Sequence, residues 1–297
     1  MITAMRSELV EVPNSAGTTR PRIAAPEGAC DSHIHIYDPR FPAARPDVAV
    51  VANATAADYR LLQRRIGTTR TVVVQPAAYG TDNRVTLDAI ERLGRESTRG
   101  IAVLHPDVSD ADLEALDRGG IRGLRFTQHD PRTAVTTAEM IAPLARRIQA
   151  FGWHIQIHLR APQIVEMAGL IESLPGTIVI DHMGRIPEPI GTHHAAFALV
   201  RRWLGEGRTW VKLSGAYLES RDAPRYSDVS RVAREYAMTA PERLVWGSDW
   251  PHPTEAVAKP DDAVLFDLLG EWAPPEGLRR RILVENPETL YGFKGPS

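Results

Sequence analysis

Short apolar runs and segments with helical spacing alternate along most of the chain. Val72-Val73-Val74 is one such run, with the length and composition of a buried parallel strand. The sequence predicts strands at 29–36, 72–74, 100–105, 121–126, 153–160, 177–182, 210–214 and 243–246. It predicts a helix that begins after Thr55 and further helices at 81–93, 110–116, 138–151, 162–174, 194–204 and 229–238.

This order of elements restricts the fold to the α/β class, because strand and helix alternate without hairpins. Eight parallel strands joined by helices most simply close into a (β/α)8 TIM barrel, in which reactive groups lie at the C-terminal ends of the strands. An open doubly wound sheet is the alternative, but no Gly-x-Gly-x-x-Gly loop follows the first strand. We therefore expect a single barrel domain at 28–297, preceded by a short N-terminal extension at 1–27.

Composition and charge argue against several classes of partner. The 297 residues are 43% hydrophobic and 24% charged, and their net charge is -2. Such a chain has no overall positive field to attract nucleic acid or an anionic membrane, and no apolar run is long enough for a signal sequence or a membrane span. The single cysteine, Cys30, has no partner for an internal disulfide. We expect a cytoplasmic protein, and the sequence does not indicate its oligomeric state.

Two histidines lie near the end of the first predicted strand. Residues two apart in a strand point to the same side, so His33 and His35 project together while Ile34 faces the other way. Such a pair is either a metal clamp or a pair of hydrogen-bond donors, although two surface histidines on an edge strand have the same spacing. Polar groups at the ends of later strands favour a functional site.

Ionisable residues also lie at the ends of the fifth, sixth and eighth predicted strands. His154 and His158 share the polar face of the fifth strand, and His158 lies nearer its C-terminal end. We expect His154 to be structural and His158 to reach the mouth of the barrel. His182 closes the sixth strand. Asp249 follows the eighth, beside tryptophans and prolines that would exclude water and raise its proton affinity, so it is a candidate general base or acid. The alternative for Asp249 is a solvated aspartate in a turn.

Arginines near the fourth and fifth predicted strands indicate an anionic substrate. A guanidinium group binds a carboxylate through two nitrogens, and Arg122, Arg125 and Arg160 are expected where these strands end. Surface arginines are common, however, and the case for a ligand is better for Arg125 than for the other two.

Four further polar residues lie just past predicted strand ends. His252 is expected either to bind substrate or to cap its loop. Tyr79, Asn83 and Tyr217 have the hydrogen-bonding groups to bind substrate hydroxyls. Each of them is also an ordinary loop residue, so the sequence leaves both interpretations open.

In combination these motifs resemble the amidohydrolase superfamily, and specifically its lactone-processing branch. The similarity extends from about Cys30 to Tyr291. Within the branch it is greatest to the galactarolactone isomerases, with the pyrone dicarboxylate lactonases and sulfomuconolactone hydrolases as relatives. The motifs are His33-x-His35, Val74-Gln75, Gly120-Ile-Arg122-Gly-Leu-Arg125-Phe126, His158, Asp181-His182-Met183-Gly184-Arg185 and Trp246-Gly-Ser-Asp249-Trp-Pro-His252.

The resemblance implies roles for the central residues. His33, His35 and His182 would surround the lactone carbonyl. Asp249 would shuttle the proton, and Arg125 would hold a substrate carboxylate. These roles are those of the family's matching positions, transferred to this chain residue by residue.

Two departures from the pattern bear on the substrate. The pyrone-hydrolysing members have a tyrosine where His158 stands, and they have a second substrate-binding arginine a few residues beyond Arg125. That second position falls near Pro131 in this chain. The departures favour a polyhydroxylated sugar-diacid lactone over a flat dicarboxylate.

The activity implied by the resemblance is that of a lactone isomerase in D-galactarate or galacturonate catabolism. It would convert D-galactaro-1,5-lactone to the 1,4-lactone by attack of a substrate hydroxyl, with Asp249 as the proton shuttle. The first alternative is a lactonase that hydrolyses an aldarolactone, a muconolactone or a pyrone dicarboxylate. A mononuclear zinc decarboxylase is a further alternative. A binding protein without activity is least favoured, because several ionisable groups converging on one mouth are costly unless they are used.

No cofactor is expected to be required, since the lactone branch is largely independent of metal. A single zinc ion is the alternative, and His33, His35, His158 and Asp249 would then form its shell, with one position left for water. The fourth predicted strand and its extension, 121–128, contain no lysine or glutamate to bridge a second ion. A binuclear centre is therefore not expected.

Overall fold

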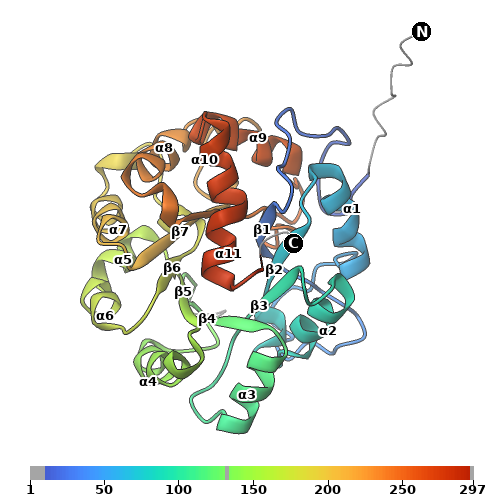
Figure 1. Cartoon of the computed structure of the whole chain (residues 1–297), viewed down its shortest axis with the longest axis vertical. Helices are drawn as coiled ribbons and strands as arrows, with labels where there is room; N and C mark the ends of the chain where they lie inside the picture. Colours follow the sequence, from blue (N-terminus) through green and yellow to red (C-terminus); the bar gives the residue numbers. More distant parts are fainter. Residues whose placement is uncertain (1–10, 131–133, 295–297) are drawn as a thin grey trace.

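The computed structural model describes residues 11–130 and 134–294, and it shows a ring of parallel strands surrounded by helices (Figure 1). Each strand pairs with the next one along the chain, in the order β1 to β8. Backbone hydrogen bonds of 2.8 Å from His35 to Trp250 and of 2.9 Å from Asp249 to His33 join β8 to β1. The predicted (β/α)8 barrel is confirmed.

The strands are β1 (Cys30–Ile34), β2 (Arg70–Val74), β3 (Thr98–Ala102), β4 (Ile121–Thr127), β5 (His154–His158), β6 (Ile178–Ile180), β7 (Thr209–Leu213) and β8 (Leu244–Trp246). The helices are α1 (Ala56–Ile66), α2 (Arg84–Leu93), α3 (Asp110–Arg118), α4 (Ala138–Ile148), α5 (Ala161–Glu166), α6 (Ala168–Ser173), α7 (Ala195–Gly205), α8 (Ser230–Thr239), α9 (Asp262–Trp272), α10 (Glu276–Arg280) and α11 (Asn286–Tyr291). Shorter helical turns are η1 (Ala77–Tyr79), η2 (Gln149–Phe151), η3 (His182–Gly184), η4 (Gly191–His193), η5 (Ala216–Leu218), η6 (Pro241–Arg243) and η7 (Arg281–Glu285).

Local capping explains where the helices begin and end. Thr55 and Asp58 form a reciprocal capping box at the start of α1, and Gly67 ends that helix with a φ of 87°. Helix α2 begins at Arg84, later than predicted, because the side-chain amide of Asn83 is hydrogen-bonded to the backbone of Val103. The helix predicted at 162–174 is divided into α5 and α6.

The N-terminal end of the barrel forms a closed floor. Helix α11 lies across the centre of the ring in Figure 1, and the residues that follow it bond to the first residues of β2 and β3. The Arg70 side chain donates to Glu288 and to the carbonyl of Lys294, both at 2.7 Å. The guanidinium groups of Arg70 and Arg99 lie over the ring of Phe293. A second apolar cluster fills the barrel above this layer, made of Cys30, Val72, Val74, Ile101, Val179, Trp210, Val245, Tyr291 and Phe293.

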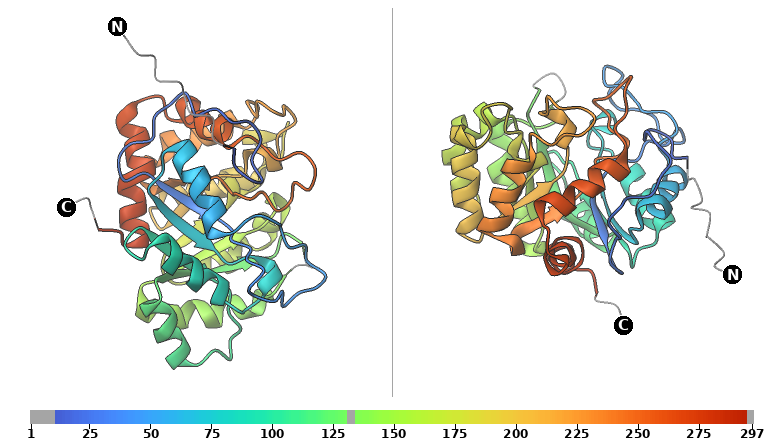
Figure 2. Two further views of the ribbon diagram at one scale, coloured as in Figure 1. Left: turned by 90° about the vertical axis from the view of Figure 1, so that its right-hand side faces the viewer. Right: turned by 90° about the horizontal axis from the view of Figure 1, so that it is seen from above.

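The described part of the N-terminal extension is bonded to the barrel. It runs beside α1 and α9 (Figure 2). The Trp250 indole donates to the carbonyl of Pro13 at 2.8 Å, and the amide of Asn14 donates to two carbonyls of the loop before α1. The buried guanidinium of Arg65 binds three carbonyls of residues 16–19. This segment therefore supports the loop that follows β8.

Among the described helices, none has both the length and the apolar character needed to cross a membrane.

Candidate active site

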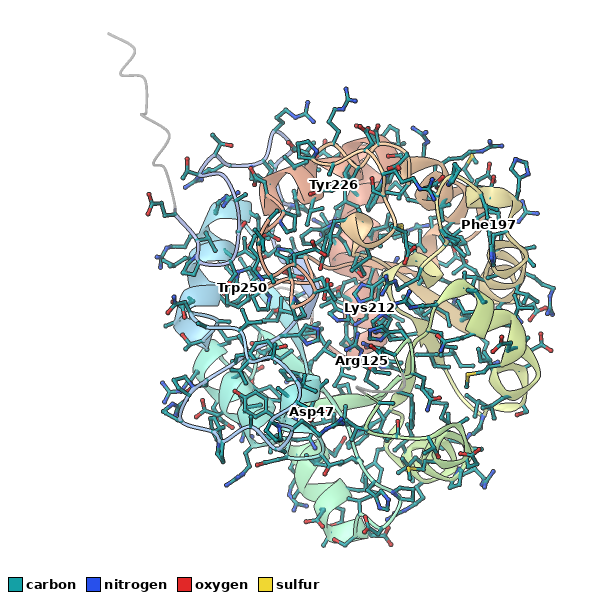
Figure 3. All side chains as sticks on the ribbon, turned by 180° about the vertical axis from the view of Figure 1, so that it is seen from behind. Asp47, Arg125, Phe197, Lys212, Tyr226 and Trp250 are labelled. Carbon is teal, nitrogen blue, oxygen red and sulfur yellow. The ribbon has the colours of Figure 1, made fainter. Side chains whose placement is uncertain are left out.

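A cavity of about 240 Å³ opens at the C-terminal ends of the strands. Figure 3 views the molecule from this side and shows Arg125 and Lys212 near the centre of the ring. The deeper wall of the cavity is polar and the outer wall is largely apolar. The polar wall includes His35, Arg125, His129, His158, His182 and Asp249, and the apolar wall includes Val48, Ala49, Pro76, Ala77, Leu218 and Pro253.

Five imidazole rings form a continuous series, of which four line the cavity and the fifth, His33, is fully buried beside them. The ring centroids of His33 and His35 are 5.0 Å apart, and that of His182 lies 4.7 Å from His33. His158 follows at 4.8 Å from His182, and His129 stacks on His158 at 4.2 Å. The structure thus brings together the four histidines expected at the strand ends and adds His129.

The loop after β8 places Asp249 at the bottom of the mouth. Asp249 has a positive φ of 65°, a conformation that side chains rarely adopt outside tight turns. Asp31 holds this loop, since its carboxylate accepts from the backbone of Ser248 at 2.9 Å and from its hydroxyl at 2.6 Å. A side chain at Gly247 would come within 2.6 Å of the Cβ of His33, so only glycine lets the two strands approach here.

The Asp249 carboxylate has one bonded oxygen and one oxygen without a hydrogen bond. Oδ2 accepts from the hydroxyl of Tyr217 at 2.7 Å. Oδ1 lies 3.5 Å from Nε2 of His33 and 3.5 Å from Nε2 of His35, with no hydrogen-bond partner. This unbonded oxygen keeps the capacity to accept a proton.

Asp249 is held in its ionised form. Burial alone would raise its pKa, but His182, His35 and His33 together hold the pKa of Asp249 well below its usual range. The sequence-based expectation of a raised proton affinity was therefore wrong, because it counted the apolar neighbours of Asp249 and not the surrounding imidazoles.

Hydrogen-bond partners assign the protons of two imidazoles. Nδ1 of His35 lies 2.8 Å from the carbonyl of Val74, which only accepts, so Nδ1 carries a proton. Nδ1 of His158 lies 3.0 Å from a guanidinium nitrogen of Arg125, which only donates, so the proton is on Nε2. Nε2 of His158 has no partner within the protein. His158 is therefore a hydrogen-bond donor available to a ligand.

Arg125 is fixed from both sides. Its Nε donates to Oδ2 of Asp181 at 2.9 Å, and Gln156 donates to the same oxygen at 3.1 Å. Burial would raise the pKa of Asp181, but the neighbouring cations Arg125 and Lys212 hold it well below its usual range. Arg125 is only 6% exposed, and it lines the cavity with its orientation set before any ligand arrives.

Several predicted site residues do not line this cavity. Tyr79 is bonded to the backbone of Asp38, and Asn83 is bonded to the backbone of Val103. His252 is fully buried, with Nε2 at 3.2 Å from Asp262. These three side chains are used within the fold.

The predicted group of arginines does not form. Arg122 lies near the N-terminal end of β4, 3.2 Å from Asp117, so its expected place at the strand end was wrong. Arg160 is exposed, and its Nε donates to the carbonyl of His129 at 3.2 Å. It supports the loop that presents the His129 ring and does not itself reach the cavity lining. Only Arg125 of the three lines the cavity.

Two contacts of the site were missed by sequence reasoning. Tyr217, expected to bind substrate hydroxyls, donates instead to Asp249, and burial raises its pKa so that it stays a neutral donor. Lys212 is fully buried in β7, and its Nζ lies 3.4 Å from Nδ1 of His33. Burial lowers the pKa of Lys212 to about 8, while Asp181 favours its charged form, so the ammonium predominates at neutral pH. A lysine within an apolar strand was the available signal.

Some histidines and aspartates lie close enough together to hold a metal ion, but the predicted zinc shell does not fit. Within the described chain, possible ligand atoms lie within 4.8 Å of one another in two groups, His33 with His182 and Asp249, and His158 with Asp181 and His182. A zinc ligand must be an imidazole nitrogen without a proton. The cavity-facing Nε2 of His158 carries one, because Arg125 occupies Nδ1. The shell of His33, His35, His158 and Asp249 is therefore incompatible with these hydrogen bonds.

Comparison with known proteins gives consistent matches over nearly the whole chain. Residues 30–293 match the family model described as Amidohydrolase. The chain is 34% identical over 287 residues to the 2-pyrone-4,6-dicarboxylate hydrolase of Comamonas testosteroni, covering 93% of this chain and 94% of that protein. It is 32% identical over 277 residues to the D-galactarolactone isomerase of Agrobacterium fabrum, covering 92% and 94%. An apo crystal structure from Agrobacterium tumefaciens has a TM-score of 0.86 and 30% identity, covering 96% of this chain and 99% of that one.

Proposed function

This chain belongs to the amidohydrolase family, and from that premise we propose that it isomerises D-galactaro-1,5-lactone to the 1,4-lactone. The relatives described above support the general part of this proposal, an enzyme that acts on a small anionic lactone. The finer part, isomerisation of a sugar-diacid lactone, is supported by the chemistry of the cavity.

The observation that carries the proposal is the unbonded Oδ1 of an ionised Asp249 beside imidazoles. Opening a lactone requires a base for the incoming hydroxyl and donors for the oxyanion that forms on the carbonyl oxygen. Asp249 supplies the base, and the Nε2 proton of His158 supplies one donor. Both groups line the same cavity, so a single lactone ring can meet them together.

In the isomerisation, the substrate's 4-hydroxyl attacks carbon 1 while Asp249 accepts the hydroxyl proton. A tetrahedral intermediate forms, with its negative oxygen facing the imidazole donors. The bond from carbon 1 to the 5-oxygen then breaks, and the proton returns from Asp249 to that leaving oxygen. Atoms and charges balance without water, metal or cofactor. Asp249 is suited to both transfers because its second oxygen is anchored by Tyr217.

Arg125 supports a substrate with one free carboxylate. It is the arginine that lines the cavity within the described residues, and Pro131, where the relatives' second arginine would fall, lies outside them. The galactaric 1,5-lactone keeps one carboxylate after the other has closed the ring, whereas a pyrone dicarboxylate keeps two. The fixed guanidinium of Arg125 can bind that one carboxylate, which supports the sugar-diacid lactone.

Hydrolysis of such a lactone is the second candidate, and the 34% identity to a hydrolase favours keeping it. The two reactions differ in the nucleophile, which is a substrate hydroxyl in one case and water in the other. Incubating D-galactaro-1,5-lactone with the enzyme in oxygen-18 water separates them by mass spectrometry and NMR. We expect an unlabelled 1,4-lactone. Label in an open-chain diacid would establish hydrolysis, and unchanged lactone would contradict the proposed substrate.

A further inference from the structure

Lys212 is a buried cation to which the proposed chemistry gives no role. Its side chain is fully buried and lies near Arg125 at the centre of the ring (Figure 3). Nζ donates to the carbonyl of Ser32 at 2.8 Å and lies 3.4 Å from Nδ1 of His33. A buried ammonium is costly unless its protons are used, so these contacts call for an explanation.

Two groups of opposite character approach the same nitrogen of His33. Nδ1 lies 3.4 Å from Nζ of Lys212 and 3.4 Å from Oδ1 of Asp181. The ammonium can only donate and the carboxylate can only accept, so the two groups require opposite tautomers of the ring. Oδ1 of Asp181 has no hydrogen-bond partner, whereas the lysine contact has hydrogen-bond geometry. The arrangement therefore favours an unprotonated Nδ1.

We propose that Lys212 is a positioning residue that keeps the proton of His33 on Nε2, on the side of Oδ1 of Asp249 at 3.5 Å, so that His33 serves there as a hydrogen-bond donor and not as a metal ligand. The importance of this donor beside the catalytic base rests on the proposed function. The tautomer itself does not, because it is argued from the contacts of Nδ1 with Lys212 and Asp181.

The same arrangement occurs on the other side of the site. Arg125 occupies Nδ1 of His158, a residue that lines the cavity, and leaves the proton on its Nε2, as Lys212 does for the buried His33. Both Nε2 atoms are buried and lack partners within the protein. Two cations, each behind one imidazole, thus make donors of two of the histidines. Within the group of His33, His182 and Asp249, His33 then lacks the bare nitrogen that a zinc ligand needs.

The tautomer can be measured directly in the unmodified protein. Nitrogen-15 NMR of histidine-labelled protein distinguishes a protonated from an unprotonated ring nitrogen, and a spectrum of His33→Gln assigns the His33 signals by difference. We expect an unprotonated Nδ1 and a protonated Nε2. A proton on Nδ1 would overturn the proposal, and this measurement does not depend on whether any variant of Lys212 folds.

Replacing the cation should reverse the tautomer. In Lys212→Met the remaining neighbour of Nδ1 is Asp181, so the proton should move to Nδ1 and leave Nε2 bare. Zinc affinity, measured by equilibrium dialysis of the metal alone, should rise about tenfold or more, since groups behind a ligating histidine change metal affinity by ~10–100-fold. Lactone turnover should fall in the same variant. An unchanged His33 tautomer with unchanged zinc affinity would refute the role of Lys212.

A matched control separates this effect from general loosening of the barrel. Thr98→Val also replaces a buried polar group on a barrel strand, and its hydroxyl has no hydrogen-bond partner. It should leave the His33 tautomer and zinc affinity unchanged; zinc binding that rises equally in the control would count against a specific effect of Lys212. If the unmodified protein shows the expected tautomer but does not convert the lactone, the proposed function is contradicted. The proposal for Lys212 is unaffected by that result.

Discussion

The two ends of the barrel use the same residue type in opposite ways, as His154 and His158 on β5 show. Both side chains are buried, at 2% and 5% exposure. His154 lies against Tyr291 near the floor, neither of its ring nitrogens has a partner, and burial lowers its pKa to about 3. His158 lies at the mouth, with one nitrogen fixed by Arg125 and the other facing the cavity. An unbonded buried nitrogen is thus insufficient to mark a site; a fixed orientation and access to a cavity are also needed.

The largest test of this contrast is Asp249→Asn at the mouth. The amide preserves the shape of the side chain but cannot accept the hydroxyl proton, so kcat/KM for the lactone should fall by about 10²–10⁴-fold. Circular dichroism should show an unchanged fold. A fully active variant would show that Asp249 does not transfer the proton. The contrast between a catalytic mouth and a structural floor would then lack its main support.

Phe293→Ala tests the floor. The ring is 5% exposed and lies under the guanidinium groups of Arg70 and Arg99, so its removal should lower the free energy of unfolding by about 3–5 kcal/mol. Urea denaturation measures the loss, and kcat/KM at a temperature where the variant is folded should stay within about twofold. A large loss of activity in the folded variant would mean that the two ends are coupled.

Tyr217→Phe tests how the mouth of the barrel sets the pKa of Asp249. Its hydroxyl donates to the carboxylate of Asp249, and a donor to the charged form lowers an acid's pKa. Removing the donor should raise the pKa of Asp249, so activity should be lost at a higher pH as the solution is acidified. A hydrogen bond to a charged group contributes ~1.5–3 kcal/mol, so we expect a loss of kcat/KM of about 10–150-fold at neutral pH. An unchanged acidic limb in the pH profile would show that Tyr217 does not tune the base.

The smallest effect is expected for Arg160→Ala. The side chain is exposed and bonds only to the carbonyl of His129 among the contacts in the structure, so KM for the lactone should change by less than about threefold. A tenfold rise in KM would restore the substrate-binding role that its position near a strand end first indicated.

The fold could be predicted from the sequence because alternating apolar runs and helical segments are local features. The convergence of strand-end groups followed from the barrel, since its strands end at a common mouth. The protonation of the site could not be predicted. The contact of Lys212 with His33 joins residues 179 positions apart, and its consequence depends on which of two groups at 3.4 Å bonds to the ring nitrogen. Asn83 could not be assigned from the sequence because a short polar side chain is as easily used by nearby backbone as by a ligand.

The bond between the Trp250 indole and the carbonyl of Pro13 matters for anyone who shortens this protein. A version that starts at the first strand would keep every side chain of the cavity, yet the loop carrying Asp249 would lose an anchor just one residue away. Such a truncated protein should still fold as a barrel but convert the lactone slowly. We therefore expect the functional boundary of this protein to lie upstream of the boundary suggested by its strands.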